Sequence, residues 1–268
     1  MKRQKPILSI ILVTMDTPTL TSACLKSLFK NTSIPFEVIV VNNSKGQAID
    51  QTLHEYPIHR MIQNPSNHGY ARAANQGAAI AKGNFFCFLN SDTLVPPQWA
   101  ERLIIPFKSS RAGAVNPIAN DCGYPFPFPP HPLKIDPTTV SLIDEAVQIW
   151  HSGKLERMNL LSGFCFFISQ AVMKHIGPFD ETFYFGLDDD DYSLRLRMAG
   201  YRLFRVHSVF VYHKWSGSIT ESKRKPWVEK AEIAFIHKWT NLLGQSFSSR
   251  LQINRWIDQH YPVDKSPT

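Results

Sequence analysis

The sequence lacks any apolar run as long as the roughly 20 residues that a membrane-spanning helix needs. The apolar stretch nearest the N-terminus, residues 7–13, follows basic residues as in a signal peptide, but it is short and leads into polar Thr14 and Asp16. This stretch fits a first buried strand better. We therefore expect a soluble protein of the cytoplasm, or one attached only peripherally at the inner face of a membrane.

The sequence has only four cysteines, and their spacing gives no indication of a metal site. The four cysteines, Cys24, Cys87, Cys122 and Cys165, stand far apart, and no pair has the Cys-x-x-Cys spacing of a zinc or redox centre. We expect reduced thiols, as in a cytosolic protein.

Charge of one sign is not strongly in excess either. The chain has 29 Lys and Arg residues against 22 Asp and Glu residues, a net charge of +7, with short basic clusters at residues 2–5 and 223–225. A solvated terminus or loop explains both clusters, and the second is also compatible with peripheral contact to an anionic membrane. We expect no nucleic-acid partner. With 43% hydrophobic residues, 268 residues can bury one substantial core.

Short apolar runs alternate with helical patterns through the first hundred residues. The runs at 7–13, 36–41 and 85–89 predict strands, and those at 20–29, 48–56 and 70–81 predict helices. This alternation is typical of an α/β fold with a mostly parallel central sheet flanked by helices. Further on we expect a helix at 97–107, a strand at 160–168, a helix at 188–198 that ends at Gly200, and a strand at 206–212.

The end of the chain predicts a helical tail. Residues 226–256 have a helical pattern, and the expected packing positions are Val228, Ala231, Ile233, Phe235, Ile236 and Trp239. The segment 121–132 is rich in proline and aromatic residues and fits neither a regular helix nor a central strand. It is interpreted as a stiff surface connection, with a substrate-gripping loop or a polyproline ligand as alternatives.

Polar residues follow three of the predicted strands. They are Thr14 with Asp16, then Asn42, Asn43 and Ser44, and finally Asn90, Ser91 and Asp92. Such residues form turns in many sheet proteins, but ligands of open α/β sheets also bind beyond the carboxyl ends of the strands. The oxygens of Asn90 and Asp92 could hold Mg²⁺ or Mn²⁺ that arrives with a phosphate-bearing ligand.

Four consecutive acids, Asp188 to Asp191, open the predicted helix at 188–198. Like charges so close together raise one another's pKa values, and a carboxylate in such a site can act as a general base. The alternative is a solvated helix N-terminus with an Asp cap. His213 follows the strand at 206–212, which would bring it to the same crevice if the sheet is continuous.

Read in order, these segments resemble the family 2 glycosyltransferases, which have the GT-A fold. The matching segments are LSIILVT at 8–14, FEVIVVNNS at 36–44, NPSNHGYARAANQG at 64–77, FLNSDT at 88–93, GPFDE at 177–181 and DDDDYSLRLRMAGY at 188–201. Within the family the chain is similar to a rhamnosyltransferase-like bacterial branch. The resemblance covers about the first 220 residues.

The resemblance implies a role for individual residues. Thr14, Asp16 and Asn42 would line the base pocket, Asn67, Gly69 and Ser91 would approach the nucleotide, and Asp92, Asn90 and His213 would hold Mg or Mn. Asp189 would be the catalytic base, with Asp188 and Asp191 as supporting acids. Asn90 departs from the family's Asp-x-Asp motif, and Asn42 stands where an Asp often receives the pyrimidine N3 proton; an amide oxygen can serve in both places.

The implied function is that of an inverting, metal-dependent enzyme. It would move a sugar from a UDP- or dTDP-sugar to a hydroxyl of a sugar or lipid-linked sugar, in the synthesis of surface polysaccharide or glycoconjugates. Residues 1–220 would form the catalytic domain, divided into a nucleotide-sugar half at 1–115 and an acceptor half at 116–220, with residues 221–268 as a helical extension. The alternatives are a non-catalytic sugar-nucleotide-binding protein of this fold, and a nucleotidyltransferase. The second usually carries a Gly-rich basic loop after its first strand, and this chain has none there.

Overall fold

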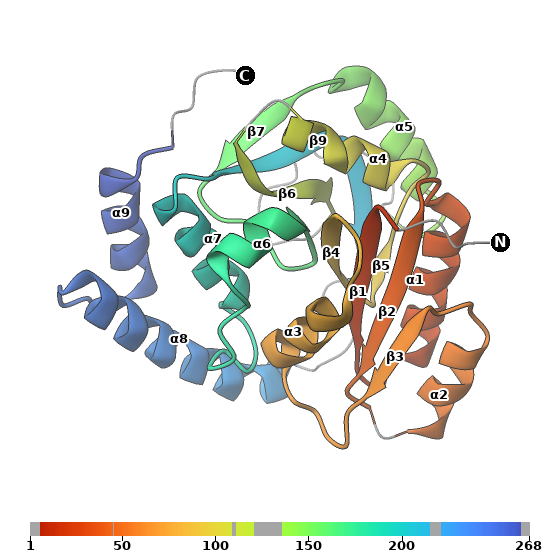
Figure 1. Ribbon diagram of the computed structural model, residues 1–268, viewed down its shortest axis with the longest axis horizontal. Coiled ribbons are helices and arrows are strands. Elements are labelled where there is room, and N and C mark those ends of the chain that lie inside the picture. The colour runs from red at the N-terminus through yellow and green to blue at the C-terminus, as the bar shows by residue number, and fades with distance from the viewer. Residues whose placement is uncertain (1–5, 45, 109–110, 121–135, 215–220, 264–268) are drawn as a thin grey trace.

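The computed structural model describes residues 6–44, 46–108, 111–120, 136–214 and 221–263, without the side chains of residues 47 and 221–223. The described strands form one sheet in the order β3-β2-β1-β4-β8-β6-β9-β5, and β7 pairs with β9 (Figure 1). The strands are β1 Leu8–Thr14, β2 Phe36–Asn42, β3 Arg60–Gln63, β4 Phe85–Asn90, β5 Thr93–Leu94, β6 Ala112–Ala119, β7 Leu155–Met158, β8 Cys165–Ser169 and β9 Arg202–His213.

The first four strands of this order are parallel. In β1, Thr14 pairs with Asn42 of β2 and Val13 pairs with Asn90 of β4, so the polar residues that follow all three strands meet at one edge of the sheet. Beyond β4 the sheet is mixed: β8 is antiparallel to β4 and β6, whereas β9 is parallel to β6. The antiparallel strand β5 pairs Thr93 with His213, which brings the end of β9 beside the end of β4.

Helices cover both faces of the sheet. They are α1 Pro18–Asn31, α2 Gln47–His54, α3 Tyr70–Ile80, α4 Trp99–Ile104, the 3-10 helix Ile105–Lys108, α5 Val140–Trp150, α6 Gln170–Ile176, α7 Asp188–Met198, α8 Glu221–Leu243 and α9 Arg250–His260. Successive strand residues point to opposite faces. Accordingly, Leu12 of β1 packs with Leu25 and Trp99 in one core cluster, while its neighbour Ile11 packs with Ala74 and Tyr192 in the other.

The last two helices pack against α7. Phe235 and Trp239 of α8 and Ile257 of α9 are buried in a third apolar cluster with Phe183 and Leu194, and Figure 1 shows α8 and α9, in blue, beside α7. The predicted tail is thus helical and packed, with an interruption at Gly244, whose φ is +65°. The expected packing of Ile233 is wrong, since this side chain is 70% exposed.

Other predictions are confirmed or corrected by the structure. Gly200, with φ +79°, ends α7 as expected. The expected strand at 160–168 is shortened to β8, because residues 160–164 form an irregular segment beside α7. Strands β3, β5, β6 and β7 and helices α5 and α6 were not predicted. The proline-rich segment 121–132 and Cys122 lie outside the described residues, while Cys24, Cys87 and Cys165 are buried free thiols.

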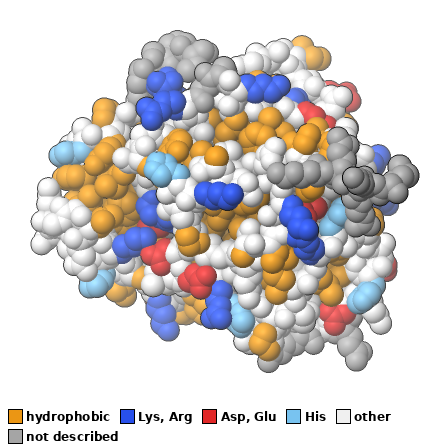
Figure 2. Space-filling model, in the orientation of Figure 1, with side chains coloured by type: hydrophobic (Ala, Val, Ile, Leu, Met, Phe, Trp, Pro, Cys, Tyr) orange, Lys and Arg blue, Asp and Glu red, His pale blue; other side chains and the backbone are white. Residues whose placement is uncertain are grey.

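The described part of the chain contains no helix long and apolar enough to cross a membrane. On the face shown in Figure 2, Lys and Arg side chains are scattered rather than gathered into one patch. The modest net charge therefore forms no single basic surface on this face.

Candidate active site

A cavity opens beyond the carboxyl ends of β1 and β4, where the parallel half of the sheet meets the antiparallel strands. Its lining comes from strand ends, from the segment before β8 and from the first turn of α7. The lining residues are Val13, Thr14, Met15, Asn43, Asn67, Gly69, Tyr70, Asn90, Ser91, Asp92, Ser162, Gly163, Phe164, Tyr184, Phe185, Gly186, Asp188, Asp189, His213 and Arg224. Nine of the predicted site residues therefore share one cavity.

Asn90, Asp92 and His213 converge in this cavity. His213 Nε2 lies 3.4 Å from Asp92 Oδ1 and 3.3 Å from Asn90 Nδ2, and the His213 ring stacks on Phe164 with centroids 5.2 Å apart. Asp92 and His213 are buried. The pairing of β5 with β9 brings Asp92 and His213 together. The Asp92 carbonyl adds a hydrogen bond from the Lys214 N–H at 2.9 Å.

The donor atoms of this trio suit a divalent cation. A carboxylate, an amide oxygen and an imidazole nitrogen are ligands that Mn²⁺ accepts, and Mg²⁺ prefers the oxygens. Asn90 faces His213 with its amide nitrogen, so its oxygen would serve as a ligand with the amide turned over. The described residues contain no group of three or more His, Cys, Asp or Glu able to hold a metal ion. Two such residues and one amide would leave several coordination positions for phosphate oxygens or water.

Asp188 and Asp189 line the cavity from the first turn of α7. Burial, and next the charge of Asp189, raise the pKa of Asp188 well above its usual value. Burial also raises the pKa of Asp189, against hydrogen bonds from the N–H groups of Gly163 at 2.7 Å and Asp190 at 2.9 Å. These two donors fix the carboxylate and favour its ionised form. A half-buried carboxylate held in this way can take a proton from a bound hydroxyl.

Asp190 and Asp191 point elsewhere. Asp190 pairs with Arg250 of α9 at 2.7 Å, and burial raises its pKa to about 7. The structure does not bring Asp191 to the cavity: its fully buried carboxylate bonds to Arg195 at 2.9 Å and to Lys238 at 2.6 Å. The role of supporting acid is thereby replaced by a structural one, because Asp191 joins α7 to α8. The four acids are not a solvated helix terminus.

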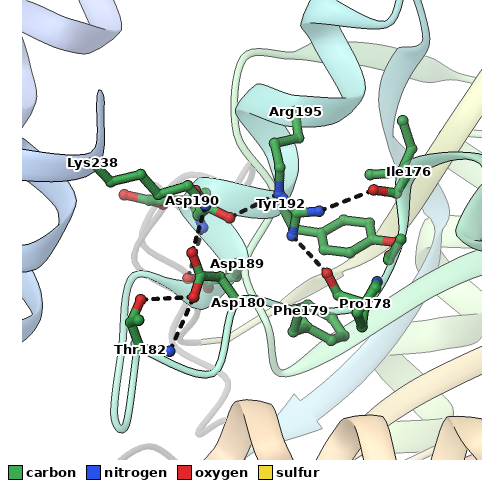
Figure 3. A network of polar contacts seen from close by, with 12 residues as sticks. Ile176, Pro178, Phe179, Asp180, Thr182, Asp189, Asp190, Tyr192, Arg195 and Lys238 are labelled. Carbon is green, nitrogen blue, oxygen red and sulfur yellow. Dashed lines mark hydrogen bonds and ion pairs between the residues drawn. The ribbon is translucent and has the colours of Figure 1, made fainter. Parts of the chain in front are cut away.

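The same network fixes the segment that leads into α7 (Figure 3). Arg195 also donates to the carbonyls of Ile176 and Pro178, at 3.2 and 3.0 Å. Lys238 bonds to Asp180 at 2.7 Å, and Asp180 accepts from the N–H and hydroxyl of Thr182. The cavity residues at 184–186 are therefore anchored on both sides.

Two residues expected in the base pocket, Asp16 and Asn42, do not line the cavity. Asn42 is fully buried, its amide group donates to Gln63 Oε1 at 2.7 Å, and its oxygen accepts from the Ser44 N–H at 2.9 Å. With both ends of the amide engaged, Asn42 stabilises the end of β2. Asp16 lies next to the cavity residue Met15, and its N–H donates to Ser44 Oγ at 2.5 Å.

Asn43 takes the position in the cavity that was expected for Asn42. Its amide donates to Asn67 Oδ1 at 3.1 Å and to the Gly69 carbonyl at 3.2 Å. The strand-end pattern had marked Asn43 as polar without distinguishing it from its neighbour. Gly163, Tyr184, Phe185 and Arg224 had carried no signal in the sequence, since they come from irregular segments and from the start of α8.

Comparison with known protein families supports the resemblance seen in the sequence. The family model described as Glycosyl transferase family 2 matches residues 9–176. An uncharacterized glycosyltransferase of Haemophilus influenzae is 33% identical over 99 residues, which cover 37% of this chain and 33% of that protein. The low-salt glycan biosynthesis hexosyltransferase Agl10 of Haloferax volcanii is 24% identical over 194 residues, covering 70% of this chain and 62% of that protein. The chain thus spans less than two thirds of the length of these relatives.

Solved structures show the same fold. The mannosyltransferase PcManGT of Pyrobaculum calidifontis, in complex with GDP-Man and Mn²⁺, aligns with a TM-score of 0.64 at 13% identity, over 96% of this chain and 70% of that one. GalNAc-T7 with UDP, GalNAc and Mn²⁺ aligns with a TM-score of 0.63 at 17% identity, over 96% and 59%. At these identities the likeness concerns the fold.

Proposed function

Because the chain belongs to glycosyl transferase family 2 and has the GT-A fold, we propose that it transfers a sugar from a nucleotide donor to an acceptor hydroxyl with inversion at the anomeric carbon. One observation carries the proposal: a single cavity is lined by the Asp92 and His213 pair and by Asp188 and Asp189. The first pair suits a diphosphate with its cation, and the second supplies a base.

The donor diphosphate would lie against Asn90, Ser91 and Asp92, and a bound Mg or Mn would supply charge that neutralises part of the diphosphate. Asp92, His213 and the Asn90 oxygen would hold the ion. The close approach of the buried Asp92 to His213 supports this assignment, as do the Mn²⁺ ions of the two structural neighbours. Thr14, Asn43, Asn67 and Gly69 would hold the nucleoside.

Asp189 would act as the base in a single displacement. The acceptor hydroxyl gives its proton to Asp189, and its oxygen forms the new bond to the anomeric carbon. The bond from that carbon to the phosphate oxygen breaks, and its electron pair leaves with the diphosphate. Asp188, whose pKa is raised further, supports Asp189 as a neighbouring acid and not as a second base.

We place the substrates within the range that the resemblance implies. The donor would be a UDP- or dTDP-sugar and the acceptor a sugar or lipid-linked sugar, in cell-surface polysaccharide or glycoconjugate synthesis at the cytoplasmic side of the membrane. The rhamnosyltransferase-like branch rests on sequence resemblance. Residues 1–220 would form the catalytic unit, and the packing of Trp239 and Ile257 against α7 ties the extension at 221–268 to it.

The proposal is tested by ligand-induced stabilisation and turnover. We expect UDP or dTDP to raise the melting temperature in the presence of Mn²⁺, and a panel of sugar nucleotides to be hydrolysed slowly in the absence of acceptor. Stabilisation by neither nucleotide, nor by GDP, would remove the donor site. Binding with no turnover of any donor would favour the non-catalytic alternative.

A further inference from the structure

An aromatic group borders the cavity beside the proposed base. Tyr184 and Phe185 line the cavity, and Trp227 of α8 packs on both, with ring centroids 5.5 Å from Tyr184 and 5.7 Å from Phe185. Tyr184 is 37% exposed, and Phe185 and Trp227 are half-buried. Two of these rings line the cavity and Trp227 packs against them, and none of the three belongs to the buried apolar clusters of the described residues.

The backbone that carries these rings is held firmly. The Tyr184 carbonyl accepts from the Tyr70 N–H at 3.1 Å, and its hydroxyl donates to the Asn67 carbonyl at 3.2 Å. On the other side Phe183 is fully buried against α8. The backbone at Tyr184 is therefore already fixed before a ligand binds, which lowers the cost of binding.

The position of the rings relates them to the acceptor. Phe185 and Gly186 line the same cavity as Asp188 and Asp189 and precede them in the chain, so the rings and the proposed base share one cavity. The diphosphate side is occupied by different residues, from Asn90 to Asp92. Arg224 extends over Phe185, with its guanidinium carbon 5.9 Å from the ring centroid, and also lines the cavity. It offers hydrogen-bond donors next to an apolar ring face.

We propose that Tyr184, Phe185 and Trp227 form an acceptor subsite that binds a pyranose ring, with Arg224 donating to its hydroxyl groups. This inference rests on the proposed function. A pyranose has one face rich in C–H groups, which carry partial positive charge, and the negative face of an aromatic ring attracts them. The acceptor is accordingly a saccharide. At this subsite the enzyme recognises the sugar ring of the acceptor and not a lipid chain.

The test measures binding of simple sugars to the whole chain. Methyl glycosides of glucose, galactose, mannose and rhamnose are added with UDP or dTDP and Mn²⁺, and saturation-transfer NMR reports which ring C–H protons touch the protein. We expect at least one glycoside to bind through its C–H face. Phe185→Ala and Trp227→Ala should each weaken that affinity by roughly three- to tenfold, while Trp227→Phe should retain most of it.

Nucleotide affinity is measured on the same samples by thermal shift and should stay within about twofold in all variants. Trp150→Ala is the matched control, because Trp150 is an exposed tryptophan of α5 that does not line the cavity. A wild-type protein that binds nucleotide but none of the glycosides would overturn the acceptor subsite alone. A loss of nucleotide affinity in the alanine variants, at unchanged glycoside affinity, would overturn it too, because the rings would then serve the nucleobase. Failure of every nucleotide to bind the wild type would remove the proposed function first.

Discussion

The backbone N–H of Gly163 donates to Oδ2 of Asp189 across 2.7 Å, which joins the segment before β8 to the first turn of α7. This bond and the one from Asp190 N–H hold the carboxylate in one orientation toward the cavity. A base positioned in this way needs no rearrangement before it accepts a proton.

Replacement of Asp189 by Asn tests its role directly. The amide is similar in shape and can still accept from Gly163, but it cannot take the acceptor's proton. We expect Asp189→Asn to lower kcat by about 10²- to 10⁴-fold and to leave nucleotide affinity unchanged. Asp190→Asn is the neighbouring control, since Asp190 pairs with Arg250 outside the cavity lining. Turnover by Asp189→Asn close to that of the control would rule out Asp189 as the base.

Asp190 predicts a pH dependence of stability. Its pKa is about 7 in the folded protein against a usual value of 3.8. Between these pH values the folded state binds more protons than the unfolded state, so this group's contribution to stability is present at low pH and is lost as the pH rises through 7. Asp190→Asn removes that contribution. The free energy of unfolding in urea of the variant, minus that of the wild type, should therefore be larger at about pH 8 than at about pH 5. An equal difference at the two pH values would contradict this prediction.

The sequence predicted the strand ends better than the side on which each residue lies. Apolar runs followed by Asn, Ser or Asp located the ends of β1, β2 and β4, and these do meet at one edge. The choice between Asn42 and Asn43 failed because adjacent residues at a strand end point to opposite sides. No local pattern could reveal this alternative, since the partners of Asn42, such as Gln63, lie on other elements.

Long-range contacts account for the other differences. Asp191 was grouped with Asp188 and Asp189 as one acidic run, but its partner Lys238 lies on α8 and turns it into a buried structural charge. The proximity of Asp92 and His213 was expected from the family resemblance, and it depends on the two-residue strand β5, which is too short to predict from periodicity. Phe185 was not marked by any local pattern, because its aromatic neighbour Trp227 lies on the distant helix α8.

The metal assignment predicts opposite effects for two variants. His213→Ala removes a ligand and should raise the Mn²⁺ concentration needed for half-maximal activity by about tenfold or more. Asn90→Asp adds a second carboxylate beside Asp92 and should lower that concentration, and it should allow Mn²⁺ to raise the melting temperature without nucleotide. Chelation should abolish turnover in both. A Mn²⁺ requirement that neither variant changes would mean that Asp92 and His213 form only a structural pair.

The ion pair of Lys238 with Asp191 predicts a loss of stability when the charge of Lys238 is removed. Lys238→Met leaves the buried Asp191 carboxylate with Arg195 and Trp239 as partners, and removal of one member of a buried pair is costly. We expect the free energy of unfolding, measured in urea, to fall by roughly 3 kcal/mol, the low end for a buried pair because Lys238 is 26% exposed. Lys230→Met, an exposed change on the same helix, should have little effect. The double variant Lys238→Met with Asp191→Asn should lose less than the sum of the single changes.

Alanine variants at two glycines of nearly the same backbone conformation distinguish backbone strain from an effect on the cavity. Gly69 has φ +81° and Gly177 has φ +90°, where a side chain costs about 1–3 kcal/mol. A Cβ on Gly69 would lie 2.6 Å from the Tyr184 carbonyl oxygen, whereas a Cβ on Gly177 meets nothing within 4 Å. Both alanine variants should therefore lose stability, but only Gly69→Ala should displace the Tyr184 segment from the N-terminus of α3.

That displacement has a measurable consequence for ligands. The Tyr184 carbonyl accepts from Tyr70, and its hydroxyl donates to Asn67, so its shift moves the proposed nucleotide contacts and the aromatic group together. We expect Gly69→Ala to weaken nucleotide affinity by at least about tenfold, equivalent to 1.4 kcal/mol, and Gly177→Ala to leave it within about twofold. Equal nucleotide affinity in the two variants would mean that the close approach of Gly69 to Tyr184 does not shape the donor site.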